Sequence, residues 1–172
     1  MLTSLRPDGA RRWDIGVIDG PNMPNLGNRS KKIYGPIRSL DALQALVRNT
    51  AEDLGVTVTQ FASNHEGEIL EFIHNTGREV HGYIINPAGL TTYGEATRHA
   101  LDDTTKPVVE VHFGNTARHF AEVAPHFQQQ TSRFTYTGLV MGLRQYSYLG
   151  ALVGLTLALD DESFLAGGKN RH

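Results

Sequence analysis

The chain has 172 residues, of which 40% are hydrophobic and 20% are charged, values that fit one globular domain and exclude a disordered or fibrous protein. A formal net charge of −2 argues against a bulk electrostatic attraction to nucleic acid or to an anionic membrane. The sequence contains no cysteine, which excludes disulfides, thiolate nucleophiles and cysteine-based metal sites, and this composition predicts a cytoplasmic protein.

Apolar runs typical of strands alternate with helical patterns along most of the chain. Residues 1–12 are expected to be a flexible N-terminal extension, and residues 166–172 are expected to be a flexible tail. Residues 13–165 are expected to form a single domain, because the alternation indicates stacked βαβ units around a parallel sheet. Residues 113–133 have no clear periodicity, and their run of three glutamines is expected to be a loop. The predicted strands are 13–18, 56–61, 82–85 and 108–111, and the predicted helices are 40–54, 66–76, 94–101 and 142–159.

A long polar loop, residues 19–35, follows the first predicted strand. A connection of this length without secondary structure is more often a lid or a binding loop than slack chain. The loop contains Arg29 and Tyr34. A phenol loses its proton only near pH ~10, so an adjacent guanidinium, which is always charged, can make a tyrosine usable as a base. The alternative is a mobile surface loop with a solvated arginine and a packing tyrosine.

Local signals support the predicted helices and indicate where a site lies. Ser39 can cap the helix at 40–54, Gly55 can end it in the left-handed conformation, and residues 63–66 have the pattern of a capping box. In a parallel open sheet, ligands bind outside the carboxyl ends of the strands. We therefore expect one crevice to be formed by the polar residues at these ends, namely 19–22, 63–66, 86–92 and 110–115.

Several separate blocks of the sequence together resemble one enzyme family. They are Asp19-Gly-Pro-Asn22, Leu26-Gly27, Ile33-Tyr-Gly35, Ser63-Asn-His-Glu-Gly-Glu68, Ile85-Asn-Pro-Ala-Gly-Leu-Thr91 and Val109-Glu-Val-His112, with Arg29, Asn115 and Arg118 at matching positions. Their order and spacing resemble the type II 3-dehydroquinate dehydratases over residues 13–118. The resemblance implies a flavodoxin-like three-layer α/β sandwich, whose parallel sheet is covered by helices on both faces. It also implies a dodecamer built from trimers.

The same resemblance implies a reaction and roles for individual residues. The reaction is a cofactor-free elimination of water from a cyclic β-hydroxy ketone, 3-dehydroquinate, to give 3-dehydroshikimate. By match to the family's pattern, Tyr34 is the base that removes the C2 proton, and Arg29 holds it as tyrosinate. Asn22 positions the water that stabilises the enolate oxygen. His112 protonates the departing C1 hydroxyl, and Asn86 grips the same hydroxyl.

The residue types around His112 suit the acid role independently of the resemblance. An imidazole can donate a proton near neutral pH, which makes it the usual general acid. Glu110 lies two residues earlier, so both side chains project from the same face of the predicted strand. We expect Glu110 to orient the imidazole as a further catalytic residue. The alternative is that His112 is a buried core histidine whose hydrogen bonds are satisfied and which has no catalytic role.

Several positions depart from the family's pattern. Thr92 stands in place of a substrate-contacting histidine, and His99 stands in place of an aspartate that reaches the catalytic arginine of the neighbouring subunit. In the segment that holds the substrate carboxylate, Phe113 and Gly114 replace isoleucine and serine. An arginine of the family has no clear counterpart after Arg118. The candidate substrate-binding residues are Asn86, Thr92, His99, Phe113, Gly114 and Arg118.

Two other readings are left open, namely a diverged member that acts on a different hydroxylated ring ketone and a non-catalytic oligomer that binds a small molecule. A flavoprotein is a third and more distant reading, and the sequence has no Gly-x-Gly-x-x-Gly run for a dinucleotide. The cluster His65, Glu66 and Glu68 lacks metal-ligand spacing, so capping and packing explain it better. We expect a cyclic carboxylate substrate, a homo-oligomer, no metal or cofactor, and no nucleic-acid or membrane partner.

Overall fold

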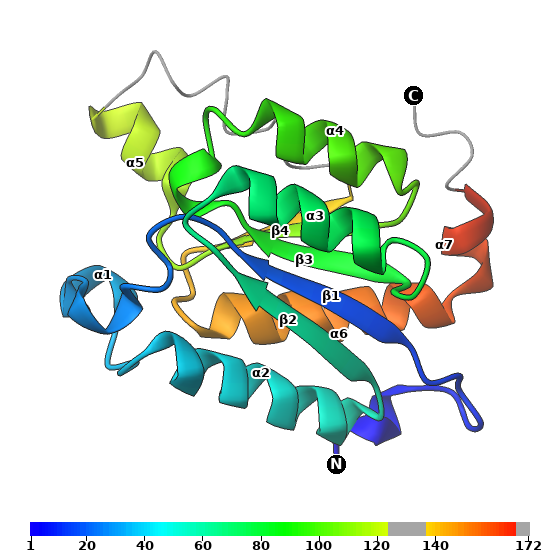
Figure 1. Cartoon of the computed structure of the whole chain (residues 1–172). Coiled ribbons are helices and arrows are strands. Elements are labelled where there is room, and N and C mark those ends of the chain that lie inside the picture. The colour runs from blue at the N-terminus through cyan, green and yellow to red at the C-terminus, as the bar shows by residue number, and fades with distance from the viewer. Residues whose placement is uncertain (124–136, 168–172) are drawn as a thin grey trace.

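The computed structural model describes residues 1–123 and 137–167 of the chain. Its centre is a parallel sheet of five strands in the order β2-β1-β3-β4-β5 (Figure 1). Parallel strands need crossover connections, and helices supply them here on both faces of the sheet. The strands are β1 (Asp14–Asp19), β2 (Thr57–Ala62), β3 (Gly82–Asn86), β4 (Val108–His112) and β5 (Gly138–Met141).

Helices form the two outer layers. The helices α2 (Leu40–Leu54) and α6 (Tyr146–Asp160) cover one face of the sheet, and α3 (Glu66–Thr76) and α4 (Glu95–Asp103) cover the other (Figure 1). This arrangement confirms the predicted flavodoxin-like three-layer α/β fold. Within the described part of the chain, no helix is long and apolar enough to cross a membrane. The shorter segments are α1 (Lys31–Tyr34), α5 (Thr116–Val123), α7 (Glu162–Gly167) and 3₁₀ helices at Leu2–Leu5, Leu26–Asn28 and Ala88–Leu90.

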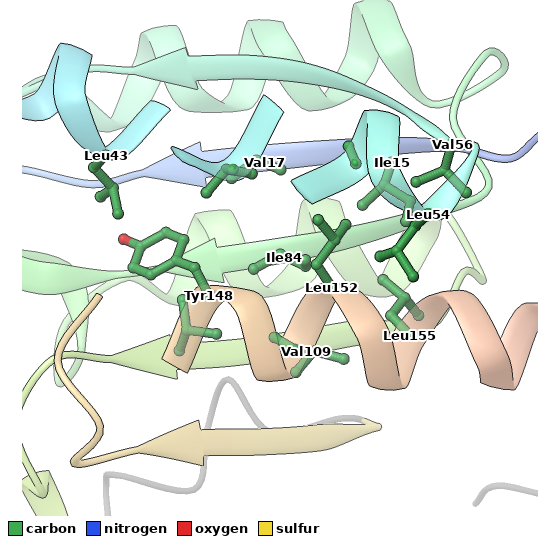
Figure 2. Close-up of a cluster of buried hydrophobic side chains, with 14 of the residues drawn as sticks. Ile15, Val17, Leu43, Leu54, Val56, Ile84, Val109, Tyr148, Leu152 and Leu155 are labelled. Atoms are coloured by element: carbon green, nitrogen blue, oxygen red, sulfur yellow. The ribbon is translucent and has the colours of Figure 1, made fainter. Parts of the chain in front are cut away.

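Buried apolar side chains fill the space on each side of the sheet. From α6, Tyr148, Leu152 and Leu155 pack against strand residues such as Ile15 and Ile84 (Figure 2). Strands covered on both faces bury every side chain, which explains the apolar runs Ile84-Ile85 in β3 and Val108-Val109 in β4. Each aliphatic side chain buried in this way contributes about 1.5–3 kcal/mol. The packed core fixes the positions at which the strands end, and with them the polar residues that follow.

The predicted limits of α2 are confirmed. The backbone N–H of Ala42 donates to the Ser39 side-chain oxygen at 3.1 Å, so Ser39 satisfies one of the donors that the first turn leaves open. At the other end, Gly55 has a φ of 71° and a ψ of 30°, the left-handed conformation that closes many helices.

The predicted capping box before α3 is wrong. The side-chain oxygen of Ser63 accepts from the N–H of His65 at 2.9 Å and donates to Glu68 rather than pairing with Glu66. Glu66 instead accepts from the backbone N–H of Thr97 at 3.1 Å and from its hydroxyl at 2.9 Å. It therefore links α3 to the start of α4, as the packing explanation of this acidic cluster expected.

Some elements were absent from the sequence prediction. The edge strand β5 lies where no strand was predicted, and the apolar helix expected from residue 142 begins at Tyr146. The loop at 19–35 is not structureless, because it contains the 3₁₀ helix Leu26–Asn28 and α1. The predicted glutamine loop lies outside the described residues.

Part of the N-terminal segment is packed on the domain. The guanidinium of Arg6 donates two hydrogen bonds to the Asp160 carboxylate, at 2.7 and 2.8 Å, and the side chains of both residues are about 95% buried, with 5% and 6% exposed. The indole N–H of Trp13 donates to the same carboxylate at 2.7 Å. These contacts hold Arg6 against the domain, and the predicted flexibility of the other residues of 1–12 stays a prediction. Of the predicted tail, residues 168–172 lie outside the described residues.

Candidate active site

A cavity of about 560 Å³ lies at the carboxyl ends of β3 and β4, where the sequence predicted a crevice. Its wall is built by the loop after β1, the turn after β3, the end of β4 and helix α5. A volume of this size is typical of a small-molecule site. The predicted site residues that line it are Arg29, Tyr34, Asn86, Thr92, His112, Phe113, Gly114 and Arg118.

Arg29 and Tyr34 lie together on the wall that the loop after β1 provides. The short helix α1 ends with Tyr34, and Gly35 follows it at a φ of 73°. The guanidinium carbon of Arg29 is 3.9 Å from the centroid of the Tyr34 ring, and the ring of Phe113 packs on the same ring at a centroid distance of 5.4 Å. This is a cation–π contact, with the guanidinium over the face of the tyrosine ring. The contact that the sequence predicts between the two residues is present, and the role of Tyr34 as a base stays a prediction.

His112 ends β4, and its imidazole faces the same cavity. Its Nε2 is hydrogen-bonded to the Glu110 carboxylate, as the spacing of the two residues on one strand face predicts. Glu110 is 0% exposed and His112 is 5% exposed. A buried carboxylate bound to one ring nitrogen fixes the orientation of an imidazole. The ring so held can deliver a proton to a leaving group in the cavity.

Asn86 ends β3 and belongs to a buried chain of hydrogen bonds. Its side-chain N–H donates to the Tyr148 hydroxyl at 2.9 Å, and that hydroxyl donates to the Asp19 carboxylate. The Asn86 side-chain oxygen accepts from the N–H of Ala88 at 3.1 Å. Burial raises the pKa of Asp19 to about 7, with the hydrogen bond from Tyr148 acting in the opposite direction. Burial also raises the pKa of Tyr148 well above its usual range.

Three predicted site residues, Asn22, His99 and Glu110, are not among the described residues that line the cavity, and Glu110 lies behind His112, to which it is hydrogen-bonded. Asn22 is exposed at a φ of 75°, and its backbone N–H donates to the side-chain oxygen of Asn64 at 2.8 Å. His99 is exposed on α4, with its Nε2 2.7 Å from a guanidinium nitrogen of Arg98. Their roles toward a bound water and a neighbouring subunit stay predictions.

Sequence reasoning did not assign every residue of the wall. Thr91 and Asn115 belong to the polar strand-end segments, so the signal for them was present. Glu122 reaches the cavity on α5, where its carboxylate accepts from Arg118 at 2.8 Å, but this part of the sequence has no readable periodicity. Met23 is apolar and fully buried, so its residue type gave no indication of a site.

Comparison with known proteins agrees with this geometry. The profile of the family described as dehydroquinase class II matches residues 13–156. The chain is 39% identical over 150 residues to the 3-dehydroquinate dehydratase of Halothermothrix orenii, an alignment that covers 87% of this chain and 98% of the relative. It is 38% identical over 143 residues to the 3-dehydroquinate dehydratase of Roseiflexus castenholzii, covering 80% of this chain and 85% of the relative.

Solved structures give the same result. The crystal structure of the type II dehydroquinase from Propionibacterium acnes superposes with a TM-score of 0.73 at 28% identity, covering 86% of this chain and 99% of that chain. The structure of the type II dehydroquinase from Butyrivibrio crossotus superposes with a TM-score of 0.71, also at 28% identity, covering 84% of this chain and 97% of that chain. The chain therefore belongs to the dehydroquinase class II family.

Proposed function

We propose that this protein is a hydro-lyase that converts 3-dehydroquinate to 3-dehydroshikimate and water. The observation that carries the proposal is the pairing of two sets of groups around one cavity. On one wall the Arg29 guanidinium lies on the Tyr34 ring, and on another the Glu110 carboxylate holds His112. An elimination of water needs a base for the carbon-bound proton and an acid for the leaving hydroxyl. The two pairs supply one of each.

In the proposed mechanism, Tyr34 acts as tyrosinate and removes the proton from C2 of the ring. The electron pair of the C–H bond passes to the ketone oxygen as an enolate, and Asn22 positions the water that stabilises this charge. The enolate then collapses, the C1–C2 double bond forms, and the C1–O bond breaks. His112 gives its proton to the leaving hydroxyl, so that water departs, while Asn86 holds that hydroxyl in place. General acid and base catalysis of this kind contributes about 10²–10⁴-fold each.

The substrate carboxylate is proposed to bind at the turn after β4, where Phe113 and Gly114 line the cavity and Arg118 supplies a positive charge. Thr92 lines the cavity from the turn after β3. His99, exposed on α4, is proposed to meet a neighbouring subunit. These assignments give the carboxylate one cation and backbone donors in place of a serine hydroxyl.

The test is a direct assay of enone formation from 3-dehydroquinate by its ultraviolet absorbance. The wild type should produce a rising absorbance, and Tyr34→Phe should reduce kcat by about 10³-fold, because the ring stays while the base is lost. Tyr146→Phe is the matched control, since Tyr146 is 58% exposed and is not among the described residues that line the cavity. No enone from the wild type would rule the proposal out.

A second candidate function is the dehydration of a different hydroxylated ring ketone, and the observation that favours it is Gly114. At this position the cavity wall carries no side chain, whereas the resembled family has a serine for the carboxylate. An uncharged or bulkier ring fits such a wall as readily as a carboxylate. Competing substrates in the same absorbance assay separate the two functions. A non-catalytic oligomer would bind these rings and give no enone from any of them.

For assembly and location, a homo-oligomer, a dodecamer built from trimers, in the cytoplasm is proposed. What supports the assembly is family membership together with exposed apolar side chains, Leu139 at 36% and Leu143 at 57%, at and directly after the edge strand β5. Analytical ultracentrifugation gives the mass directly, and one subunit has a mass of 18.9 kDa. A species of the monomer mass at micromolar concentration would contradict the proposed assembly.

A further inference from the structure

Asp19 is a buried carboxylate that the proposed chemistry leaves without a task. It ends β1 and is 1% exposed, and its register partner on the neighbouring strand β3 is Asn86. A carboxyl group buried in this way destabilises a fold unless its hydrogen bonds compensate. The bond that the structure gives its side chain comes from Tyr148, at the start of α6. A costly group beside a cavity is a candidate for a functional role.

The hydrogen bonds of this chain have one consistent direction. An ionised carboxylate only accepts, so the single proton of the Tyr148 hydroxyl must point at Asp19. The raised pKa of Tyr148 keeps that proton in place. The lone pairs of the hydroxyl oxygen then face Asn86. The Asn86 amide N–H donates a hydrogen bond to this oxygen at 2.9 Å. The Ala88 N–H fixes the opposite end of the amide through its oxygen. A flipped Asn86 amide would meet the lone pairs of Tyr148 with its own oxygen and lose both bonds.

The fixed amide leaves one group available to a ligand. Besides its bond to Tyr148, the Asn86 nitrogen lies 3.4 Å from the sulfur of Met23, and both residues line the cavity. Sulfur is a weak acceptor, so a hydroxyl oxygen can replace it at little cost. We propose that Asp19 is a positioning residue that acts through Tyr148 to orient Asn86, so that one amide N–H meets the substrate hydroxyl. This inference rests on the proposed function, which assigns Asn86 to the leaving hydroxyl.

The proposal predicts that activity and stability respond to Asp19 in opposite directions. Asp19→Asn removes the buried charge and keeps an oxygen that accepts from Tyr148, so thermal stability at pH 8 should hold or rise. An amide can also donate, however, so Tyr148 no longer has a single allowed orientation and Asn86 loses its restraint. We expect kcat to fall about tenfold while KM changes less than twofold. If Asp19 had only a structural role, stability and activity would fall together in Asp19→Asn.

The pH profile gives a second signature. Asp19 faces Tyr148 from α6 and Asn86 from β3, neither of which is charged near neutrality, and the other ionisable groups of the site are Glu110 and His112 at the end of β4. Below neutral pH a protonated Asp19 can donate, so the orientation of Tyr148 is lost. The wild-type kcat profile should therefore contain an acid limb near pH 7, where Asp19 titrates, that is absent in Asp19→Asn. An unchanged limb in that variant would assign it to another group.

The deciding experiment is a double-mutant cycle on kcat with 3-dehydroquinate, using Asp19→Asn, Tyr148→Phe and the double variant. Because Asp19 acts through Tyr148, the double variant should be no slower than Tyr148→Phe alone, which we expect to lose about 10- to 100-fold. Losses that multiply would overturn the proposal. Thermal melting of each variant identifies a folding defect, and Asp19→Asn with the pH profile decides the case if Tyr148→Phe is unstable.

The same cycle separates this inference from the proposed function. If the wild type gives no enone from 3-dehydroquinate, the proposed function fails. The cycle is then run by calorimetry on the affinity for 3-dehydroquinate itself, which keeps the C1 hydroxyl and is not consumed in that case. A double variant that binds no more weakly than Tyr148→Phe would support the orientation of Asn86 by Asp19, and losses of affinity that multiply would refute it whatever the reaction is.

Discussion

At the scale of single residues, Gly114 leaves a gap in the wall of the cavity that a small side chain can fill. A Cβ atom at this position would lie 3.6 Å from the Ile33 side chain, an ordinary contact, and the φ is not in the left-handed region. Gly114→Ser should therefore fold normally and place a hydroxyl where the resembled family has one. If the substrate carboxylate binds here, this hydrogen bond is worth about 1 kcal/mol, and KM for 3-dehydroquinate should fall about fivefold.

Steady-state kinetics with Gly114→Ala as the matched control checks this expectation. Alanine fills the same space and adds no donor, so its KM should stay near that of the wild type. An equal change in both variants would mean that shape, and not the hydroxyl, controls affinity at Gly114. No change in either would place the carboxylate elsewhere in the cavity.

Asp19 makes the stability of the fold depend on pH with an unusual sign. Its pKa is raised to about 7 in the folded state, above the value of ~3.9 for an unfolded aspartate, so the folded state binds more protons between these values. Stability should fall as pH rises from about 4 to about 7, by at most about 4 kcal/mol, and change little through this group outside that range. Urea unfolding at pH 5 and pH 8 should show a smaller decrease for Asp19→Asn than for the wild type. An equal decrease in the two proteins would refute this assignment.

At the scale of elements, the two helices before β2 begin in different ways, and this difference can be measured. Ser39 accepts a hydrogen bond from Ala42 at the start of α2, whereas Ser30, at the start of α1, makes no side-chain cap bond in the described structure. Ser39→Ala should lower the free energy of unfolding by about 1 kcal/mol, and Ser30→Ala should change it by less than about 0.5 kcal/mol. Chemical denaturation of both variants tests the pair, and equal losses would contradict the capping argument.

The contrast between these elements also explains what the sequence could predict. The limits of α2 follow from residues within one turn of each end, Ser39 and Gly55, so they are readable locally. Glu66 has an equally local signal, the pattern of a capping box. Its carboxylate instead accepts a hydrogen bond from Thr97 of another helix, which the local sequence does not indicate. The edge strand β5 is short and, among the residues that the structure describes, pairs with β4 alone, so nothing in its own sequence separates it from a loop.

The same distinction applies to the candidate site. The polar ends of β3 and β4 were predictable, because a parallel sheet brings the carboxyl ends of its strands to one edge. The contact of Arg29 with Tyr34 was predictable as well, since the two residues share one loop. The chain from Asp19 through Tyr148 to Asn86 was not, because its members are separated by up to 129 residues and meet only after α6 packs on the sheet.

At the scale of the whole molecule, the N-terminal segment joins the C-terminal ends of α2 and α6, at the end of the sheet opposite the cavity. Arg6 bonds the carboxylate of Asp160, the last residue of α6, and also donates to the carbonyl oxygen of Leu54, the last residue of α2, at 3.0 Å. Trp13, directly before β1, shares the Asp160 carboxylate. One side chain thus connects the ends of both helices that cover this face of the sheet, so its effect should be on stability and not on catalysis.

Replacing this arginine tests that division. Arg6→Ala leaves the Asp160 carboxylate with the Trp13 bond and without its cation, so the free energy of unfolding should fall by about 2–4 kcal/mol while kcat stays unchanged below the melting temperature. Arg6 lowers the pKa of Asp160, so this contribution is complete above the unfolded value of about 4 and is lost as pH falls through the folded value. Urea unfolding should show a difference between the two proteins at pH 7 that shrinks toward pH 3.

Arg11→Ala, which removes a cation 4.8 Å from the centroid of the Trp13 ring, is the control and should cost about 0.5–1 kcal/mol. A difference for Arg6→Ala that persists unchanged at pH 3 would show that the arginine stabilises the fold through the carbonyl of Leu54 and not through Asp160.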